Sequence, residues 1–295
     1  MDLIYYLELA VNGAMGGLMY ALVAMGIVLI YKSSSVPNLA QGALTMAAAY
    51  IVLAFSDALG IAPLLAIPLA ALAMFLAGML IERVALRRLA GWPIVMVLMM
   101  TLGLDIFIRA ITLTFWGGSA RTLQLGIPDT PLFIGPLLIN RAYLVGAVVA
   151  LVFFAIFRFF FRTRRGILLR AIADDYVASW SVGISVEHGV ALSWALSSLT
   201  ATAAGALWGS VQTVDQGLSL LLLKGLTVAV LGGLDSIGGA VLAGLLLGIV
   251  ENILAGYLDP LLGGGTRELV VALVLILTIM IRPFGLFGKH DIERI

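Results

Sequence analysis

The sequence predicts an all-α, polytopic integral membrane protein. Of its 295 residues, 62% are hydrophobic and only 11% are charged, whereas an ordinary soluble domain has about 25% charged residues. Apolar runs of about 20 residues, each long enough for a helix that crosses a bilayer, fill most of the chain. Because so few charged residues cannot cover a soluble surface, we expect a single membrane-embedded domain over residues 1–295.

Charge and residue content exclude several classes of function. A net charge of +1 provides no basic surface for nucleic acid. The absence of cysteine excludes disulfides, thiolate chemistry and iron–sulfur sites, and two histidines alone make no soft-metal cluster. Both histidines, His188 and His290, are expected in cytoplasmic regions, so an intramembrane serine protease would lack its base. We therefore expect no enzyme, no metal site and no cofactor.

Nine apolar segments are expected to be helical, with bounds set by hydropathy and by glycine and proline. They are Leu7–Tyr31, Val36–Phe55, Ile61–Ile81, Pro93–Trp116, Tyr143–Phe161, Val186–Val211, Leu218–Leu234, Ile237–Tyr257 and Leu269–Ile281. The second opens with Pro-Asn-Leu-Ala-Gln-Gly, and the seventh is short and runs into a glycine pair. Either can be a broken or re-entrant helix, so the sequence allows eight or nine spans.

The basic residues predict an outer N-terminus and a cytoplasmic C-terminus, because Lys and Arg gather in cytoplasmic loops. With nine alternating segments, this orientation places twelve of the seventeen basic residues inside, namely Lys32, Arg83, Arg87, Arg88, Arg158, Arg162, Arg164, Arg165, Arg170, Arg282, Lys289 and Arg294. It places three outside, namely Arg121, Arg141 and Arg267. The reverse orientation would invert this bias.

One cytoplasmic loop, Arg162–Ile184, is expected to form a helix. Apolar side chains recur along it every four residues, at Leu168, Ile172, Tyr176 and Trp180. Arg170 and Asp174 are spaced to pair on the opposite face, and Gly183 would end the helix. A basic loop lying on the bilayer surface would also explain the arginines. A long, structured loop is more typical of a functional element, so we expect it to dock a cytoplasmic partner.

The loop resembles that of LivH-type permeases, the membrane subunits of ABC importers for branched-chain amino acids and related small solutes. The similar residues are Gly166-x-x-x-Arg170-Ala171-x-Ala173-x-Asp175, followed by Gly183-Ile184. Further stretches resemble the same family in order along the chain, at Gly17–Leu22, Pro37–Gly42, Ala229–Ala240 and Arg282–Gly288. Three positions depart from the family, where Gln41 replaces a usual His, Asp235 a usual Gly and Phe284 a frequent Gln. The first departure leaves the solute open.

This resemblance implies a permease domain of a bacterial inner-membrane importer, surrounded by lipid, that moves a small solute such as a branched-chain or other amino acid. It implies a second permease subunit, identical or different, two cytoplasmic ATPase subunits and an extracytoplasmic solute-binding protein. ATP would bind to those partner subunits, since this chain has no Gly-x-x-x-x-Gly-Lys-Ser/Thr. The residues implied to couple the ATPases to the spans are Gly166, Arg170, Asp174, Asp175, Tyr176 and Gly183.

The two glycine-interrupted segments, one in each half, are where a translocation pathway is expected. Irregular backbone at membrane depth must be buried in protein or line water. Ser35 can cap a helix that has Pro37 at its first position, which would put two amide side chains on one face. The candidate pathway residues are Asn38, Gln41, Gly42, Gly232 and Gly233. The amides can instead hydrogen-bond neighbouring helices as structural contacts, and the sequence does not decide between the two roles.

Two opposite charges lie four residues apart within Pro93–Trp116. Each alone costs about 2.5–3.5 kcal/mol at mid-membrane, so we expect Asp105 and Arg109 to pair and to face protein. A structural ion pair is the simpler interpretation. The alternative is an ion-coupled secondary transporter in which Asp105 and Arg109 are the coupling charges. Lys224 and Glu251 also fall within apolar segments, and the sequence assigns them no role.

Overall fold

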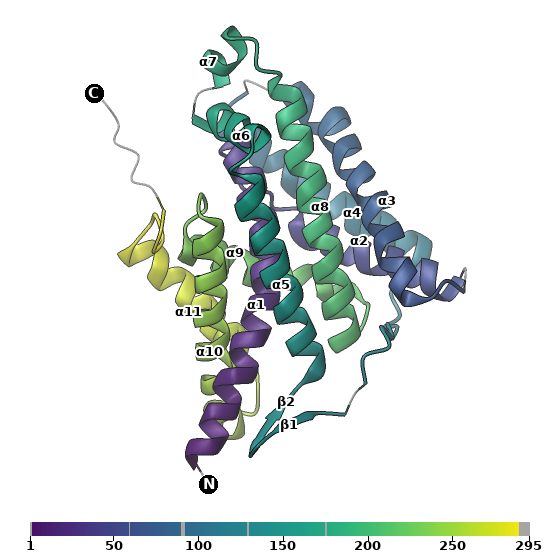
Figure 1. The fold of residues 1–295 in the computed structure, drawn as a ribbon, viewed down its shortest axis with the longest axis vertical. Helices are drawn as coiled ribbons and strands as arrows, with labels where there is room; N and C mark the ends of the chain where they lie inside the picture. Colours follow the sequence, from purple (N-terminus) through teal and green to yellow (C-terminus); the bar gives the residue numbers. More distant parts are fainter. Residues whose placement is uncertain (1, 59, 90–91, 129, 175, 289–295) are drawn as a thin grey trace.

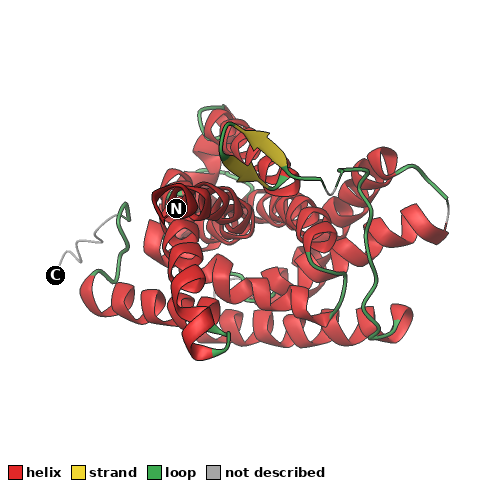
Figure 2. Ribbon diagram, turned by 90° about the horizontal axis from the view of Figure 1, so that it is seen from below, coloured by secondary structure: helices red, strands yellow, loops and turns green. Residues whose placement is uncertain are grey.

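The computed structural model describes residues 2–58, 60–89, 92–128, 130–174 and 176–288, and this part is almost entirely helical (Figure 1). The helices are α1 Asp2–Ser34, α2 Gln41–Leu53, α3 Pro63–Ile81, α4 Ile94–Trp116, α5 Arg141–Phe160, α6 Arg164–Asp174, α7 Tyr176–Ser181, α8 Val186–Val211, α9 Leu221–Gly232, α10 Ile237–Leu262 and α11 Thr266–Ile281. Strands β1 Leu132–Ile134 and β2 Leu137–Ile139 pair antiparallel, with Leu132 opposite Ile139. This hairpin lies at one edge of the helical body (Figure 2).

Short irregular helices extend three of these elements. A π-helical turn, Ala54–Ala58, follows α2, and another, Glu82–Leu86, follows α3. Two 3₁₀ turns complete the set: Arg87–Leu89 leads toward α4, and Gln216–Leu220 leads directly into α9.

Each of the nine predicted segments contains a helix, and the all-α, multi-pass class is confirmed. Six helices of the described residues are long and apolar enough to cross a membrane, and they fall in α1, α3, α4, α5, α8 and α10. The other three helices are shorter, with 13 residues in α2, 12 in α9 and 16 in α11. Two of these short helices are the segments predicted to be interrupted. The count of eight or nine crossings and the orientation of the termini stay predictions.

The first interrupted segment becomes helical later than its sequence suggests. α2 begins at Gln41, and its N-cap residue, Ala40, makes no side-chain capping bond. Ser35 instead has a φ of 54° and Pro37 precedes the helix, so the predicted cap at Ser35 is wrong. The reason is the side chain of Asn38, whose Oδ1 accepts from the N–H of Ala40 at 2.9 Å. Such a local side-chain bond competes with helix formation.

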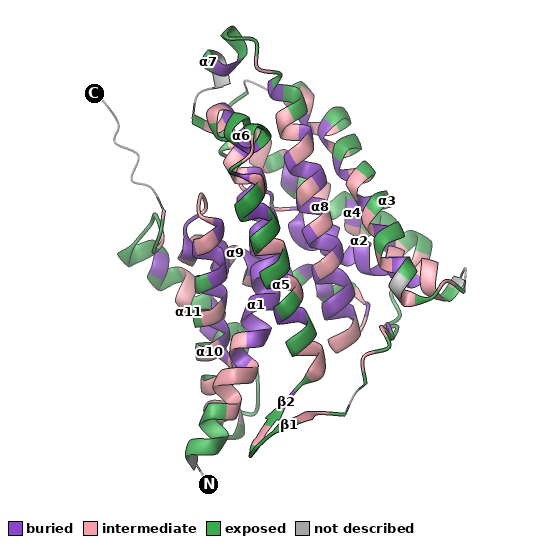
Figure 3. Cartoon of the chain, viewed as in Figure 1, coloured by how far each residue is buried: buried purple, intermediate pink, exposed green. Residues whose placement is uncertain are grey.

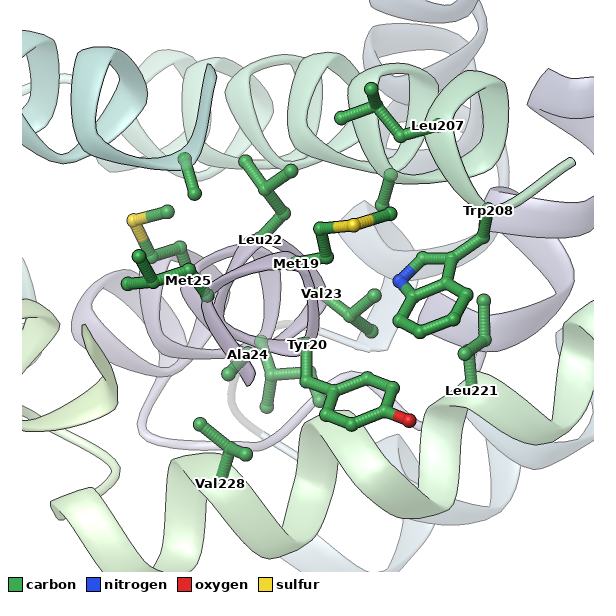
Figure 4. Packing of buried hydrophobic residues seen from close by; sticks show 14 of the residues in the cluster. Met19, Tyr20, Leu22, Val23, Ala24, Met25, Leu207, Trp208, Leu221 and Val228 are labelled. Atoms are coloured by element: carbon green, nitrogen blue, oxygen red, sulfur yellow. The ribbon is translucent and has the colours of Figure 1, made fainter. Parts of the chain in front are cut away.

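α1 is the central helix. Its most apolar stretch is 94% buried, while its N-terminal turns are exposed, as the colouring by burial shows (Figure 3). It contacts α5, α8, α9 and α10. Its approach to α10 requires glycine, because a side chain at Gly17 would collide with the backbone of Gly244. Its large side chains fill the space toward α8 and α9, where Tyr20 lies against Trp208 and Leu221 (Figure 4).

The outer helices expose apolar side chains. α3, α4 and α5 are mostly unburied over their most apolar stretches. On α3, Leu65, Leu69, Leu72 and Leu76 form an exposed stripe. A face of this kind is stable only against lipid or another membrane subunit. The described part of the chain is therefore a bundle with a buried centre around α1 and a lipid-compatible rim.

Candidate functional site

The start of α2 holds a buried network of polar side chains. Asn38 and Gln41 are both fully buried, and Asn38 Nδ2 donates to Gln41 Oε1 at 3.2 Å. Ser197 of α8 donates through its Oγ to the same Gln41 oxygen at 2.8 Å, and Gln41 Nε2 lies 3.5 Å from Thr200 Oγ1. Each amide therefore has a partner within this chain. The network holds α2 against α8, and a role for the two amides in a pathway stays a prediction.

The glycines of both interrupted segments sit at close backbone approaches. A side chain at Gly42 would collide with the carbonyl of Ser219, so α2 packs directly on the 3₁₀ turn before α9. A side chain at Gly232 would collide with Gly239, and Gly233 has a φ of 99°. These positions explain the need for glycine by packing and backbone conformation. Whether they also line a pathway stays a prediction.

The chain's C-terminal segment donates hydrogen bonds to the last carbonyls of α9. The N–H of Leu286 donates to the carbonyl of Leu231 at 2.8 Å, and that of Phe287 donates to Gly232 at 3.2 Å. Lys32, at the end of α1, donates to the carbonyl of Asp235 at 2.5 Å. Polar backbone groups in this irregular region therefore have hydrogen-bond partners within the protein, as a helix break inside a membrane requires.

Two charges that the sequence left without a role meet in the core. Lys224 Nζ of α9 lies 2.6 Å from Glu251 Oε1 of α10 and 3.0 Å from the Tyr20 hydroxyl of α1. The Tyr20 ring stacks on Trp208 of α8 with 4.8 Å between centroids. This cluster therefore connects four helices around the interrupted α9. Its only signal in the sequence is the presence of one acid and one base in neighbouring apolar segments.

A small cavity adjoins this cluster. It has a volume of about 20 Å³ and is lined by both Trp208 and Glu251, which is room for about one water molecule. Glu251 Oε2 and Trp208 Nε1 are buried, and neither has a hydrogen-bond partner among the described residues. Among all the residues that the structure describes, no three His, Asp or Glu side chains lie close enough together to hold a metal ion.

Arg109 forms an ion pair with Asp105 one turn earlier on α4. The side chain of Asp105 is 10% exposed and that of Arg109 is 31% exposed. The carboxylate also interacts with the backbone N–H of Ala43 in the first turn of α2. A negative charge near a helix N-terminus is favourable. The pair therefore faces protein, and it connects α4 to the helix that carries Gln41.

The predicted cytoplasmic loop, residues 162–184, forms two short helices, α6 and α7, instead of one. Asp175, between them, lies outside the described residues, as does the side chain of Tyr176. The predicted pairing of Arg170 with Asp174 is wrong, because Arg170 donates to the carbonyl of Phe161 at 2.9 Å. That bond closes the corner between α5 and α6, where a side chain at Gly166 would collide with Phe161.

The predicted apolar stripe of this loop is only partly buried. Ile172 is buried, together with Leu169, and both lie against Gly189 at the start of α8. Leu168 is 43% exposed and Trp180 is 71% exposed. The stripe fails as a single face because α7 does not continue the line of α6: Ser179 Oγ donates to the carbonyl of Ala171, eight residues earlier, at 2.9 Å. Two apolar side chains of the predicted stripe are thus at the surface of this chain.

Long apolar helices, two interrupted helices at their centre and buried charges between them define a multi-pass membrane transport protein. Residues 9–281 match the family described as branched-chain amino acid transport system / permease component. The chain belongs to this family of permeases, which is a family of transport proteins and not of enzymes.

Several characterised permeases are similar to the chain over its full length. BraD, a high-affinity branched-chain amino acid transport system permease protein of Pseudomonas aeruginosa, is 30% identical, and the match covers 100% of this chain and 99% of BraD. LivH of Salmonella typhimurium is 27% identical over 99% of this chain and 98% of LivH. Among solved structures, PsaBC from Streptococcus pneumoniae in complex with Fab is similar at 14% identity and a TM-score of 0.49, over 92% of this chain and 91% of that chain.

Proposed function

We propose that the chain is a permease subunit of an ABC importer in a bacterial inner membrane, and that it forms the pathway for a small solute such as a branched-chain or other amino acid. The observation that carries this proposal is its similarity over the full length to permeases named for branched-chain amino acid transport. Residues 1–295 would act as one permease domain. A second permease subunit, identical or different, two cytoplasmic ATPases and an extracytoplasmic solute-binding protein would complete the importer. ATP would bind to the ATPases, and the chain itself would need no cofactor.

The segment 162–184 would dock to an ATPase. Its apolar side chains Ile167, Leu168, Trp180 and Val182 are exposed at one end of the bundle. Its other side is fixed to the spans through the bond from Arg170 to Phe161 and the buried Ile172. An element that is anchored on one side and uncovered on the other can transmit a movement of a partner to α5 and α8.

The pathway would follow the interrupted helices α2 and α9. Both are short, α2 is largely buried and α9 is half buried, and both carry polar side chains. Short, interrupted helices of this kind are typical of binding sites in transporters. In this structure the amides of Asn38 and Gln41 are paired within the chain. Solute access would therefore require those pairs to separate when the ATPases close.

Reconstitution tests the proposal. The chain would be placed in proteoliposomes with its partner permease, ATPases and binding protein, and uptake of radiolabelled leucine would be measured. We expect uptake only with ATP on the ATPase side, and none with an ATPase that cannot hydrolyse ATP. Uptake by the chain alone on an ion gradient would instead support the alternative of a secondary transporter.

A further inference from the structure

A second cavity lies at the end of the bundle where α1 and α5 finish. It has a volume of about 280 Å³ and lies between the ends of α1 and α5, the helix α6 and the start of α10 (Figure 1). This space is large enough for a phosphate group with its neighbouring atoms. It is separate from the core cluster around Glu251, which lines a different cavity.

The charges around this cavity are mostly positive. Its lining includes four basic side chains, Lys32, Arg158, Arg162 and Arg170, and one acidic side chain, Asp235. With all five ionised, the lining carries a net charge of +3. Lys32 and Arg170 donate to backbone carbonyls. The side chains of Arg158 and Arg162 are exposed and have no acidic partner among the described residues.

The backbone at the start of α10 adds two donors. Ser236 caps this 26-residue helix by accepting from the N–H of Gly239 at 3.0 Å. No protein acceptor is found in the described chain for the N–H groups of Ile237 and Gly238, and both residues line the cavity. The first N–H groups of a helix and its dipole attract anions. At Gly238 a side chain would meet only the ring of Phe154, at 3.9 Å, so the approach to these donors is open.

An apolar surface leads from the cavity along α5. Phe154 lines the cavity, and the exposed Leu144, Val148 and Leu151 lie within three turns before it, on the side of α5 that carries Arg158 by helical spacing. A free phosphate or a nucleotide would leave this surface unused. A molecule with an anionic head and hydrocarbon tails would occupy both parts.

We propose that this cavity binds the phosphate of an anionic phospholipid, from the leaflet on the predicted cytoplasmic side. Arg158 and Arg162 supply the charge, the N–H groups of Ile237 and Gly238 supply directed hydrogen bonds, and the α5 surface receives an acyl chain. Basic pockets between helices on the cytoplasmic side are suited to such headgroups. The bound lipid would hold the corner between α5 and α6 against α10.

The test measures lipid binding by the purified chain. Wild type and variants would be titrated with phosphatidylglycerol in mixed micelles, with phosphatidylcholine as the neutral comparison, and bound lipid would be counted by native mass spectrometry. We expect the double variant Arg158→Gln/Arg162→Gln to bind phosphatidylglycerol roughly 30-fold more weakly, from about 1 kcal/mol for each basic residue near a lipid surface. Gly238→Asp, which puts a charge favourable to the helix start inside the cavity, should also weaken binding without lowering the unfolding temperature.

The matched control is Arg83→Gln/Arg88→Gln, which removes the same charge from exposed residues of the same predicted side that do not line the cavity. It should bind as wild type does. Wild-type affinity in both cavity variants, or an equal loss in the control, would overturn the proposal. Equal displacement of the lipid by inorganic phosphate would also overturn the proposal, because it would indicate a simple anion site. Loss of ATPase binding in the cavity variants with lipid binding intact would overturn it too, because it would indicate a protein-docking surface.

Discussion

Lys224 Nζ lies 2.6 Å from Glu251 Oε1, and the two side chains are only 14% and 4% exposed. They come from different helices, and one of those helices is the interrupted α9. A paired charge in a membrane core holds its helices in one arrangement, because separating the pair leaves each charge without water or a counter-charge. This contact, shared with Tyr20 of α1, is therefore expected to fix the position of α9.

Replacing Lys224 alone should destabilise the protein. Lys224→Met leaves the Glu251 carboxylate buried and uncompensated, a change that typically costs about 3–5 kcal/mol. The double variant Lys224→Met/Glu251→Gln removes both charges and keeps a group that can bond Tyr20, so it should recover much of the loss. Thermal unfolding in detergent, followed by size-exclusion chromatography, measures both. Equal damage from the single and double variants would contradict an ion-pair role.

Breaking the Asp105–Arg109 pair on α4 should also destabilise the protein, but by less than breaking the Lys224–Glu251 pair. Asp105→Asn leaves Arg109 uncompensated, but the Arg109 side chain is 31% exposed, so this long side chain is free to extend toward the membrane surface. We expect a smaller drop in unfolding temperature than for Lys224→Met. Asp105→Leu/Arg109→Leu should restore folded protein and much of the uptake. An abundant double variant without uptake would assign the pair to transport instead of structure.

The sequence predicts local features of this fold well. The predicted segment Val186–Val211 coincides with α8, because a long apolar run with a preceding glycine leaves little freedom in its bounds. The start of α2 was misplaced because one side-chain bond, from Ala40 to Asn38, decides it. Hydropathy contains no information on such a bond. Among the described residues, six helices are long and apolar enough to cross a membrane. Whether the shorter α2, α9 and α11 also cross stays a prediction, since hydropathy does not separate a short buried helix from a span.

Among the site residues, contacts within one helix were predictable from the sequence, and contacts between distant segments were not. Asp105 and Arg109 were found because their contact lies within one helix turn. Lys224 and Glu251 are 27 residues apart in sequence, and their meeting depends on how α9 and α10 pack, which is not encoded locally. The cavity between α5 and α10 has the same origin, because its basic residues come from three separate helices and from the turn between two of them.

Gln41→Ala should affect both folding and uptake. The substitution leaves the Oγ of Ser197 with only its bond to the carbonyl of Gly26 and Asn38 Nδ2 without a partner, a cost of about 1–3 kcal/mol for a buried group. We expect a lower unfolding temperature, and lower uptake per folded molecule if α2 lines the pathway as proposed. The control, Gln124→Ala, changes an exposed glutamine and should alter neither. Normal uptake per folded Gln41→Ala protein would contradict the pathway role and leave the structural one.

Gly183 tests the docking of 162–184 to an ATPase. It has a φ of 82° and no neighbour that a side chain would meet, so Gly183→Val acts only through backbone strain, which costs about 1–2 kcal/mol. Strain at this position should shift α7 relative to α8. We expect ATP hydrolysis by the assembled importer to continue while uptake falls several-fold, because the docked element no longer transmits closure to the spans.

A matched control separates this effect from strain in general. Gly126, in the loop before β1, has a φ of 74° and likewise no neighbour within reach of an added side chain. Gly126→Val therefore imposes a similar strain far from 162–184 and should leave the ratio of uptake to hydrolysis unchanged. If both variants lower that ratio equally, the loss comes from strain alone, and if neither does, segment 162–184 does not couple the two activities. Only a drop confined to Gly183→Val supports a docking element whose geometry is set by this glycine.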